Sequence, residues 1–270
     1  MHATAQGERR KLCAPGFVFF GFVLERVTCI MKVSLLHFLV TCKMQVTREM
    51  ELTMENTVIS RADQTEVPAV SGIGMFVGIL FLAWFVLVFT LGARGAFVAQ
   101  QGAPPLALLI GLLAPLSLFL IGYWAIPSLR EFVLSVDLRL IVGMQAWRWA
   151  GFGFLGLYAH GILPGIFAWP AGLGDMAVGV TSVLVLSALL RRPDFAAGKR
   201  FVTWNLLGIL DLVVAVSIGA LVPLLAPNFY GTVSTAPMSE LPLVLIPTYL
   251  VPTFLILHLT ALFQAQRLGR

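Results

Sequence analysis

The sequence predicts an all-α protein, a polytopic transmembrane helical bundle of about six spans with both termini in the cytoplasm. Hydrophobic residues make up 59% of the 270 residues, and the mean hydropathy is +0.92. Charged residues make up only 11%, compared with about 25% in ordinary soluble domains. A soluble fold cannot cover so much apolar surface, so lipid must be the solvent for most of the chain. Helices follow because hydrocarbon offers no partner for unpaired backbone groups.

The N-terminal 53 residues differ from the rest. They hold all three cysteines, and their apolar runs fall short of the roughly 20 residues that span a bilayer. We therefore interpret residues 1–53 as a poorly structured leader or a mis-assigned start, with Met1, Met44, Met50 and Met54 all open as the native start. A lipoprotein signal ending at Cys42 fits less well, because its apolar part is short. Residues 54–68 are expected to form a short cytoplasmic N-terminal segment.

Six apolar runs of membrane-spanning length follow, within a transmembrane domain at 69–263. They lie at about 69–91, 106–125, 140–160, 174–190, 201–222 and 241–263. Residues 264–270 are expected to form a cytoplasmic tail. In the first span, Gly74 and Gly78 share a helix face and permit close packing, within the chain, which we favour, or between two copies in an oligomer.

Positive charge alternates between the connections and fixes the expected orientation. The connections after the second and fourth spans and the C-terminal tail carry Arg130, Arg139, Arg191, Arg192, Lys199, Arg200, Arg267 and Arg270. The other connections carry only Arg94. The formal charge of +5 and the pI of about 9.4 are thus explained by the positive-inside rule, which places both termini in the cytoplasm, and nucleic acid is not an expected partner.

Two charges lie at matching depths inside spans. Arg148 lies roughly 12 Å from the cytoplasmic end of the third span and Asp211 roughly 15 Å from that of the fifth. An ion pair between them would fix helix register, whereas a working site would use the pair for a substrate or a proton; both interpretations stay open. Trp204 and Gly208 share a helix face with Asp211 and would form either a pocket or a packing notch.

The stretch Tyr158–Ser182 is predicted to join the third and fourth spans through a loop on the outer side. Pro164-Gly165 and Pro170-Ala171-Gly172 are read as turns within it. Asp175 is then expected in the first turn of the fourth span, where the helix dipole favours a carboxylate. His160 ends the third span, so a His160–Asp175 contact would act as a cap or as a pH-sensitive gate.

Asn205 and His258 complete the set of polar candidates inside the spans. His258 is expected near the cytoplasmic side and His160 near the outer side, so the two cannot ligate one haem iron. The sequence contains no HExxH, GxSxG or P-loop motif. The run GFGFLG (Gly151–Gly156) has GxGxxG spacing, but it lies within an expected span and not after a strand, so we interpret it as helix packing. We therefore expect no cofactor, no metal and no catalytic residue, and an enzyme is the less favoured class.

The run LPGIFAWPAGLGD (Leu163–Asp175), with WNLLGILDLVVA (Trp204–Ala215), resembles an uncharacterised family of bacterial multi-pass integral membrane proteins. The likeness covers the third to fifth expected spans. It implies the bacterial inner (plasma) membrane as location, and it implies no activity because none is assigned to that family.

The intramembrane charges and the Pro/Gly-rich stretches at 164–174 and 247–252 favour a small transporter or permease-like protein, because transporters place their sites at broken helices. The alternative is a non-catalytic sensor or an assembly partner of a membrane complex, which fits the absence of catalytic motifs. The expected partners are the lipid bilayer and a small-molecule or proton substrate.

Overall fold

The computed structural model describes residues 72–99, 103–225 and 233–269, all within one unit that spans Val70–Arg270. The expected leader at 1–53 and the segment at 54–68 lie outside the described residues. Arg270, the last residue of the expected tail, lies outside them too.

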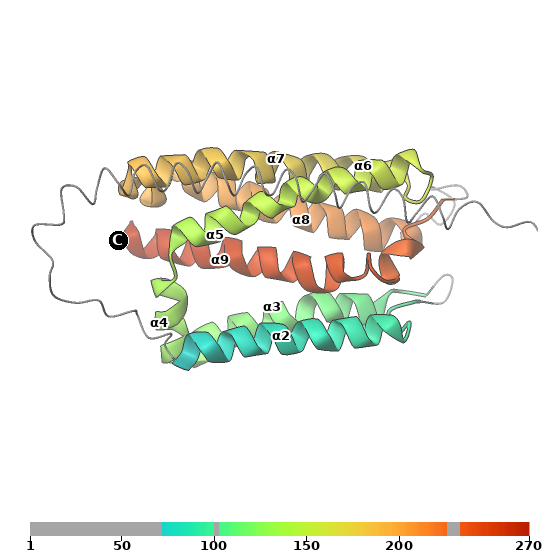
Figure 1. Ribbon diagram of the computed structural model, residues 1–270, viewed down its shortest axis with the longest axis horizontal. Coiled ribbons are helices and arrows are strands. Elements are labelled where there is room, and N and C mark those ends of the chain that lie inside the picture. Colours follow the sequence, from blue (N-terminus) through green and yellow to red (C-terminus); the bar gives the residue numbers. More distant parts are fainter. Residues whose placement is uncertain (1–71, 100–102, 226–232, 270) are drawn as a thin grey trace, which may run out of the picture. The chain divides into compact units, whose positions relative to one another are not determined.

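The described residues are helical and contain no β-strand (Figure 1). The α-helices are α2 (Gly72–Ala93), α3 (Leu106–Ala125), α4 (Pro127–Ser135), α5 (Leu138–Gln145), α6 (Phe152–Ala159), α7 (Gly165–Arg191), α8 (Lys199–Leu225) and α9 (Val251–Leu268). Shorter turns of helix are η1 (Ala146–Gly151), η2 (Pro193–Ala197), η3 (Ala236–Ser239) and the π-helical η4 (Ile246–Leu250). The all-α prediction is confirmed.

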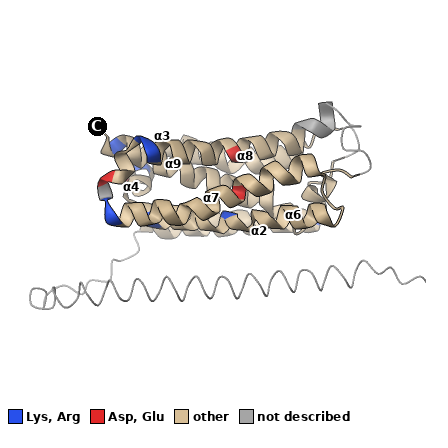
Figure 2. Ribbon diagram, turned by 90° about the horizontal axis from the view of Figure 1, so that it is seen from above, with Lys and Arg blue, Asp and Glu red and all other residues tan. Residues whose placement is uncertain are grey.

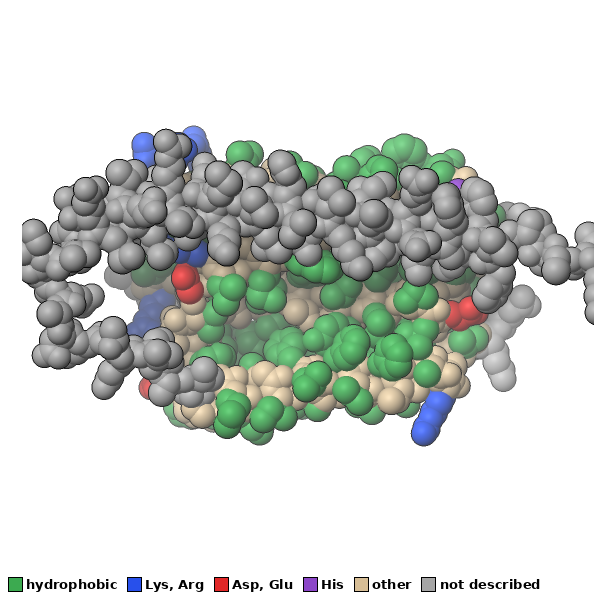
Figure 3. Space-filling model, in the orientation of Figure 1, with side chains coloured by type: hydrophobic (Ala, Val, Ile, Leu, Met, Phe, Trp, Pro, Cys, Tyr) green, Lys and Arg blue, Asp and Glu red, His purple; other side chains and the backbone are tan. Residues whose placement is uncertain are grey.

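Among the described residues, five segments are long and apolar enough to cross a membrane. They are Gly72–Ala93, Leu106–Ala125, Gly165–Arg191, Lys199–Ala220 and Ile246–Leu268. The protein is therefore a multi-pass membrane protein, as its composition predicts. The large apolar side chains that these helices expose cover much of the visible face between the two ends of the unit (Figure 3).

The third expected span, 140–160, is not a single helix. α5 and α6 are separated by the 3₁₀ segment η1, which carries Arg148. The three elements together run from the end of the unit that holds α4 to the end where α7 begins (Figure 1). A 3₁₀ turn is tighter than an α-turn, so it changes the direction in which the Arg148 side chain leaves the backbone.

The fourth span begins earlier than the expected range of 174–190. α7 begins at Gly165, and Pro170 lies inside the helix instead of in a turn. A proline near a helix N-terminus removes only one backbone hydrogen bond, and apolar residues on both sides of Pro170 favour continued helix in lipid. Asp175 consequently lies ten residues into α7, and the prediction that it occupies the first turn is wrong.

The last expected span, 241–263, is shifted toward the C-terminus. Its helical part begins at Ile246 and runs to Leu268, through most of the expected tail. Pro252 explains the π-helical turn that precedes α9: it has no N–H to donate to the Thr248 carbonyl oxygen. Trp84 of α2 supplies the missing donor, because its Nε1 donates to that oxygen at 3.0 Å. The indole thus links α2 to η4, the turn that precedes α9.

Most of the described Lys and Arg residues lie at the end of the unit that holds the C-terminus (Figure 2). Arg130, Arg139, Arg191, Arg192, Lys199, Arg200 and Arg267 all lie in or beside the element ends found there (Figure 1). Arg94 lies in the turn after α2, at the opposite end. The alternation read from the sequence is therefore a property of the fold. We refer to the C-terminal side as the basic end.

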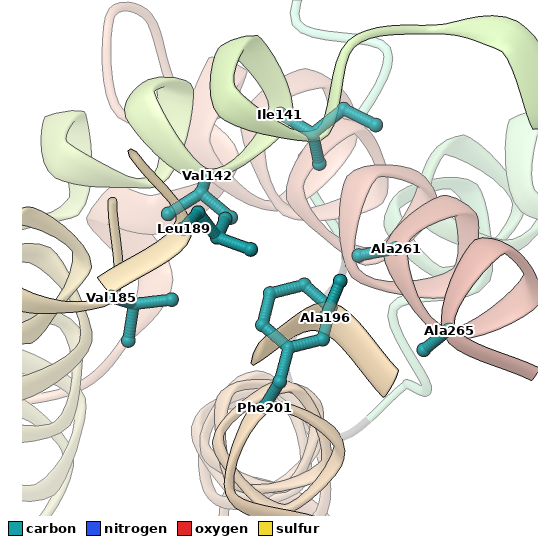
Figure 4. Close-up of a cluster of buried hydrophobic side chains, with 8 residues drawn as sticks. All are labelled: Ile141, Val142, Val185, Leu189, Ala196, Phe201, Ala261 and Ala265. Atoms are coloured by element: carbon teal, nitrogen blue, oxygen red, sulfur yellow. The ribbon is translucent and has the colours of Figure 1, made fainter. Parts of the chain in front are cut away.

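A buried apolar cluster holds the helices together near the basic end (Figure 4). Its members come from α5, α7, η2, α8 and α9: Ile141, Val142, Val185, Leu189, Ala196, Phe201, Ala261 and Ala265. The Phe201 ring lies among side chains from the other elements and is 0% exposed. Gln264 adds a polar link, since its Nε2 donates to the Val133 and Val136 carbonyl oxygens at 2.8 Å each.

We predict that Phe201→Ala lowers the free energy of unfolding by about 3–5 kcal/mol, because it leaves a cavity where helices from five elements meet. The measurement is unfolding of the detergent-purified protein, followed by circular dichroism. Phe76→Ala is the matched control, because Phe76 is 64% exposed and its loss should change stability by less than about 0.5 kcal/mol. Equal effects of the two substitutions would contradict the packing described here.

Candidate functional site

The candidate site is a buried cluster centred on Arg148. Arg148 lies in η1 between Trp147 and Trp149, and it is 2% exposed. The charge is costly at this depth, because intramembrane Arg and Asp cost about 2.5–3.5 kcal/mol on insertion scales. Such a residue persists where neighbouring groups pair with it.

The guanidinium of Arg148 binds two carboxylates from two different helices. Its Nε donates to Oδ1 of Asp175 on α7 at 2.8 Å, and its Nη2 donates to Oδ2 of Asp211 on α8. Both aspartate side chains are mostly buried, with 18% and 16% of their surface exposed. Each is the only acidic residue of its helix, and Figure 2 shows acidic residues partway along α7 and α8.

The remaining donors of Arg148 reach α8 and α9. Nη1 donates to the Gly208 carbonyl oxygen at 3.3 Å and lies 3.1 Å from Nε2 of His258. A guanidinium has no acceptor, so Nε2 must accept and the ring proton of His258 is on Nδ1. Nδ1 then donates to Oδ1 of Asn205 at 2.9 Å, and Nδ2 of Asn205 donates to the Phe201 carbonyl oxygen at 2.9 Å. One chain of hydrogen bonds therefore links four elements.

Glycines make this close approach of helices feasible. A Cβ on Gly179 would overlap the backbone nitrogen of Trp149, and one on Gly151 would overlap Cβ of Asp175. On the other side, a Cβ on Gly174 would overlap the Asp211 carboxylate, and one on Gly208 would overlap the His258 ring. The side chains of the cluster thus occupy space that only a bare backbone leaves open.

The Arg148–Asp211 pair, which the sequence left open, is formed in the structure, and the cluster contains more than that pair. Asp175 joins it because α7 begins earlier than expected. The prediction that His258 lies near the cytoplasmic side is wrong: it lies 12 residues into the segment Ile246–Leu268, in the layer of Arg148. Trp204 shares the face of Gly208 and Asp211, as predicted, and its ring packs edge-on against His258 at 5.5 Å between centroids. The notch at Gly208 is therefore filled by His258.

His160 is not part of the cluster. It caps the C-terminus of α6, whereas Asp175 lies beside Gly151, at the start of that helix. Nine residues of helix separate the two levels, roughly 13 Å. The structure thus places the His160 ring and the Asp175 carboxylate about two turns apart, and the expected contact between them is not formed.

Sequence reasoning missed Gln145. It lies one turn before Arg148 and is 1% exposed. Its Nε2 donates to the Phe254 carbonyl oxygen at 3.4 Å, while Oε1 is buried without a hydrogen-bond partner among the described residues. The same Phe254 presents its ring to Arg148, with the guanidinium carbon 5.8 Å from the centroid. The signal was available: an amide three residues before a buried arginine lies on the same helix face.

The cluster has a definite chemical character. One guanidinium faces two carboxylates, so the formal charge is −1 when both are ionised. Four of the five N–H groups of Arg148 contact protein groups, so only one N–H remains for an anionic ligand. The open sites are acceptors, namely the second oxygens of Asp175 and Asp211. The arrangement can therefore take a proton or another positively charged group.

Fold and cluster together define a polytopic α-helical membrane protein with a mixed charge cluster deep inside its helices. Residues 104–265 match a family described as Domain of unknown function (DUF8737), and because this match covers more than half of the chain, the chain belongs to that family. The match contains the whole cluster and leaves α2 outside. Searches of curated proteins and of solved structures found no match. The predicted likeness to an uncharacterised membrane family is confirmed to this extent, and its bacterial origin stays a prediction.

We predict that Gly208→Ala destabilises the protein by about 1–3 kcal/mol, because the added methyl group would displace His258 from Arg148. Thermal unfolding of the purified protein measures the effect. Gly153→Ala is the matched control: the added Cβ meets nothing within 4 Å, so its helix should gain or keep stability. Equal stability of the two variants would contradict the tight contact between α8 and α9.

The surplus carboxylate leads to a second prediction. Arg148→Gln should cost about 3–5 kcal/mol of unfolding free energy, because it leaves the buried aspartates without their cation. Asp175→Asn or Asp211→Asn alone should cost less than about 1 kcal/mol, because each keeps an acceptor for Arg148 and leaves a balanced ion pair. The double variant should be as unstable as Arg148→Gln. Single variants as unstable as the double would show that both carboxylates are scaffolding.

Proposed function

We propose that the protein is a small transporter of the permease type, with the Arg148 cluster as its ligand site. The observation that supports this most directly is the pairing of one buried guanidinium with two carboxylates. One carboxylate is sufficient to balance the charge of one arginine, and a second buried carboxylate adds a desolvation cost. Intramembrane groups kept despite such a cost are characteristic of substrate and proton pathways.

The helix breaks around the cluster support the same proposal. Arg148 lies in a 3₁₀ segment, a π-turn precedes the helix of His258, and α7 continues through Pro170, five residues before Asp175, with the loss of one backbone hydrogen bond. Transporters place binding sites where discontinuous helices meet near the middle of the membrane. We propose α5, η1 and α6 as a sixth crossing, because together they run between the same two ends as α7 (Figure 1).

We further propose that the basic end faces the cytoplasm, with both termini on that side, in the bacterial inner membrane. The support is the gathering of positive charge at that end, with Arg94 alone at the other among the described side chains in connections. The competing function is a non-catalytic sensor or assembly partner. The hydrogen bonds of Arg148 favour it, because four of its five N–H groups already contact protein groups and such a network also fixes helix packing.

Access of water to the cluster distinguishes the two functions. Ser182 is 1% exposed and lies seven residues after Asp175 toward the basic end, so a reagent from the opposite face must pass the cluster to reach it. In a chain whose Cys13, Cys29 and Cys42 are replaced by serine, we predict that Ser182→Cys reacts with a membrane-impermeant thiol reagent from either face. Alternating access requires this result, whereas a scaffold keeps the thiol sealed.

The controls use the same background. Val180→Cys should stay unreactive from both faces, because Val180 is 59% exposed toward lipid, where a thiol does not ionise. Ala197→Cys should react only from the cytoplasmic face and Ala96→Cys only from the other, which reports the orientation. Labelling of Ser182→Cys from one face only, or from neither, would leave the sensor or assembly partner as the function.

A further inference from the structure

We propose that the Asp175–Arg148–Asp211 cluster binds one exchangeable proton, held by the two carboxylates. This proposal names the proton as what the cluster binds. The role of that proton in transport rests on the proposed function. The proton itself is a property of the cluster and is tested without any flux.

The charge of the cluster sets the number of protons. Two ionised carboxylates share one guanidinium and carry a surplus charge of −1 in a region where neither side chain is more than 18% exposed. A proton adds to a lone pair of one carboxylate oxygen, forms an O–H bond, and brings the formal charge to zero. Bulk water is the source of that proton and takes it back on release. Arg148 keeps an ionised partner in either case, because one carboxylate suffices for it.

Among the described residues, the titratable and charged side chains that face these carboxylates already have hydrogen-bond partners. Arg148 from η1 stays positive, since a guanidinium is not deprotonated in proteins. His258 from α9 contacts the Nη1 side of Arg148 and turns its N–H toward Asn205. The other carboxylate is therefore the only group in the described cluster that competes for the proton.

This layer contains another acceptor to which no group donates a hydrogen bond. Oε1 of Gln145 is buried without a partner among the described residues, although the neighbouring nitrogen donates to Phe254. Phe254 also lies against Arg148, so this oxygen belongs to the same layer as the guanidinium. The layer as a whole therefore has more acceptors than hydrogens. An added proton reduces this excess, whereas an anion would increase it.

The donor set favours a proton over a metal ion. Hard cations such as Mg²⁺ or Ca²⁺ take about six or more oxygen ligands. The cluster offers one open oxygen each on Asp175 and Asp211, because Arg148 occupies the other two. Within the described ranges, no group of three or more His, Cys, Asp and Glu side chains is arranged to hold a metal ion. A proton needs one oxygen only.

Infrared difference spectroscopy on the full-length purified protein tests the proposal. A protonated carboxyl group has a C=O stretch that ionised carboxylate lacks, and the band shifts in D₂O. We expect a buried carboxyl band at neutral pH that is absent from both Asp175→Asn and Asp211→Asn, because either change leaves the other carboxylate fully paired with Arg148. Asp137→Asn is the control: Asp137 caps α5 by accepting from the Arg139 nitrogen at 2.8 Å, and asparagine caps equally well. That variant should keep the band.

Three results would overturn the proposal. They are the lack of a buried carboxyl band at every pH at which the protein keeps its helical circular dichroism, a band that survives in both variants, and loss of the band on adding Na⁺ or K⁺ at constant pH. The last result would identify a metal cation as the occupant. Cysteine labelling from both faces without the band would keep the transporter and refute the proton, whereas the band without labelling would keep the proton and refute the transporter.

Discussion

The arrangement of the helices depends on the Arg148 guanidinium. The guanidinium is buried and has lost its hydration, so its contacts with protein groups must offset that cost. Those contacts are with Asp175 on α7, Asp211 and the Gly208 carbonyl on α8, and His258 on α9. Hydrophobic burial offers little drive between helices in lipid, because lipid tails are as apolar as the side chains. A shared cation therefore does what an apolar core does in water, and fixes which faces of the helices meet.

A single side chain reaches three helices only if their backbones come close. This explains the glycines at the cluster: Gly179 admits the η1 backbone, Gly174 admits the Asp211 carboxylate, and Gly208 admits the His258 ring. The charges and the glycines are thus one feature. Glycines without the charges would allow the helices to approach but would select less strongly which faces meet. The charges without the glycines would be held too far apart to pair.

The sequence predicted the depth of a residue within its span correctly where a clear boundary marked the end of that span. Arg148 and Asp211 were matched because both are counted from basic connections, whose positions the charges mark. Asp175 was misplaced because Pro170-Ala171-Gly172 was read as a turn, and His258 because the last span was counted from 241 to 263 whereas its helical part runs from Ile246 to Leu268. Pro170 and Pro247 each lie within helical turns instead, since hydrocarbon and neighbouring helices favour continued helix at a local loss of one bond. The 3₁₀ segment at 146–151 has no compositional signal, because its tight turns follow from packing against α7.

The surplus carboxylate and the helix breaks have a common physical consequence. Arg148 keeps an ionised partner whichever aspartate is neutral. Arg148 lies in the 3₁₀ segment η1 and a π-helical turn precedes the helix of His258, whereas α8, which carries Asp211, is a continuous helix through the layer. A rearrangement would therefore move η1 and α9 relative to a fixed α8. Neutralising Asp211 would weaken the attachment of Arg148 to that fixed helix, and neutralising Asp175 would strengthen it, which couples the charge of the site to helix position.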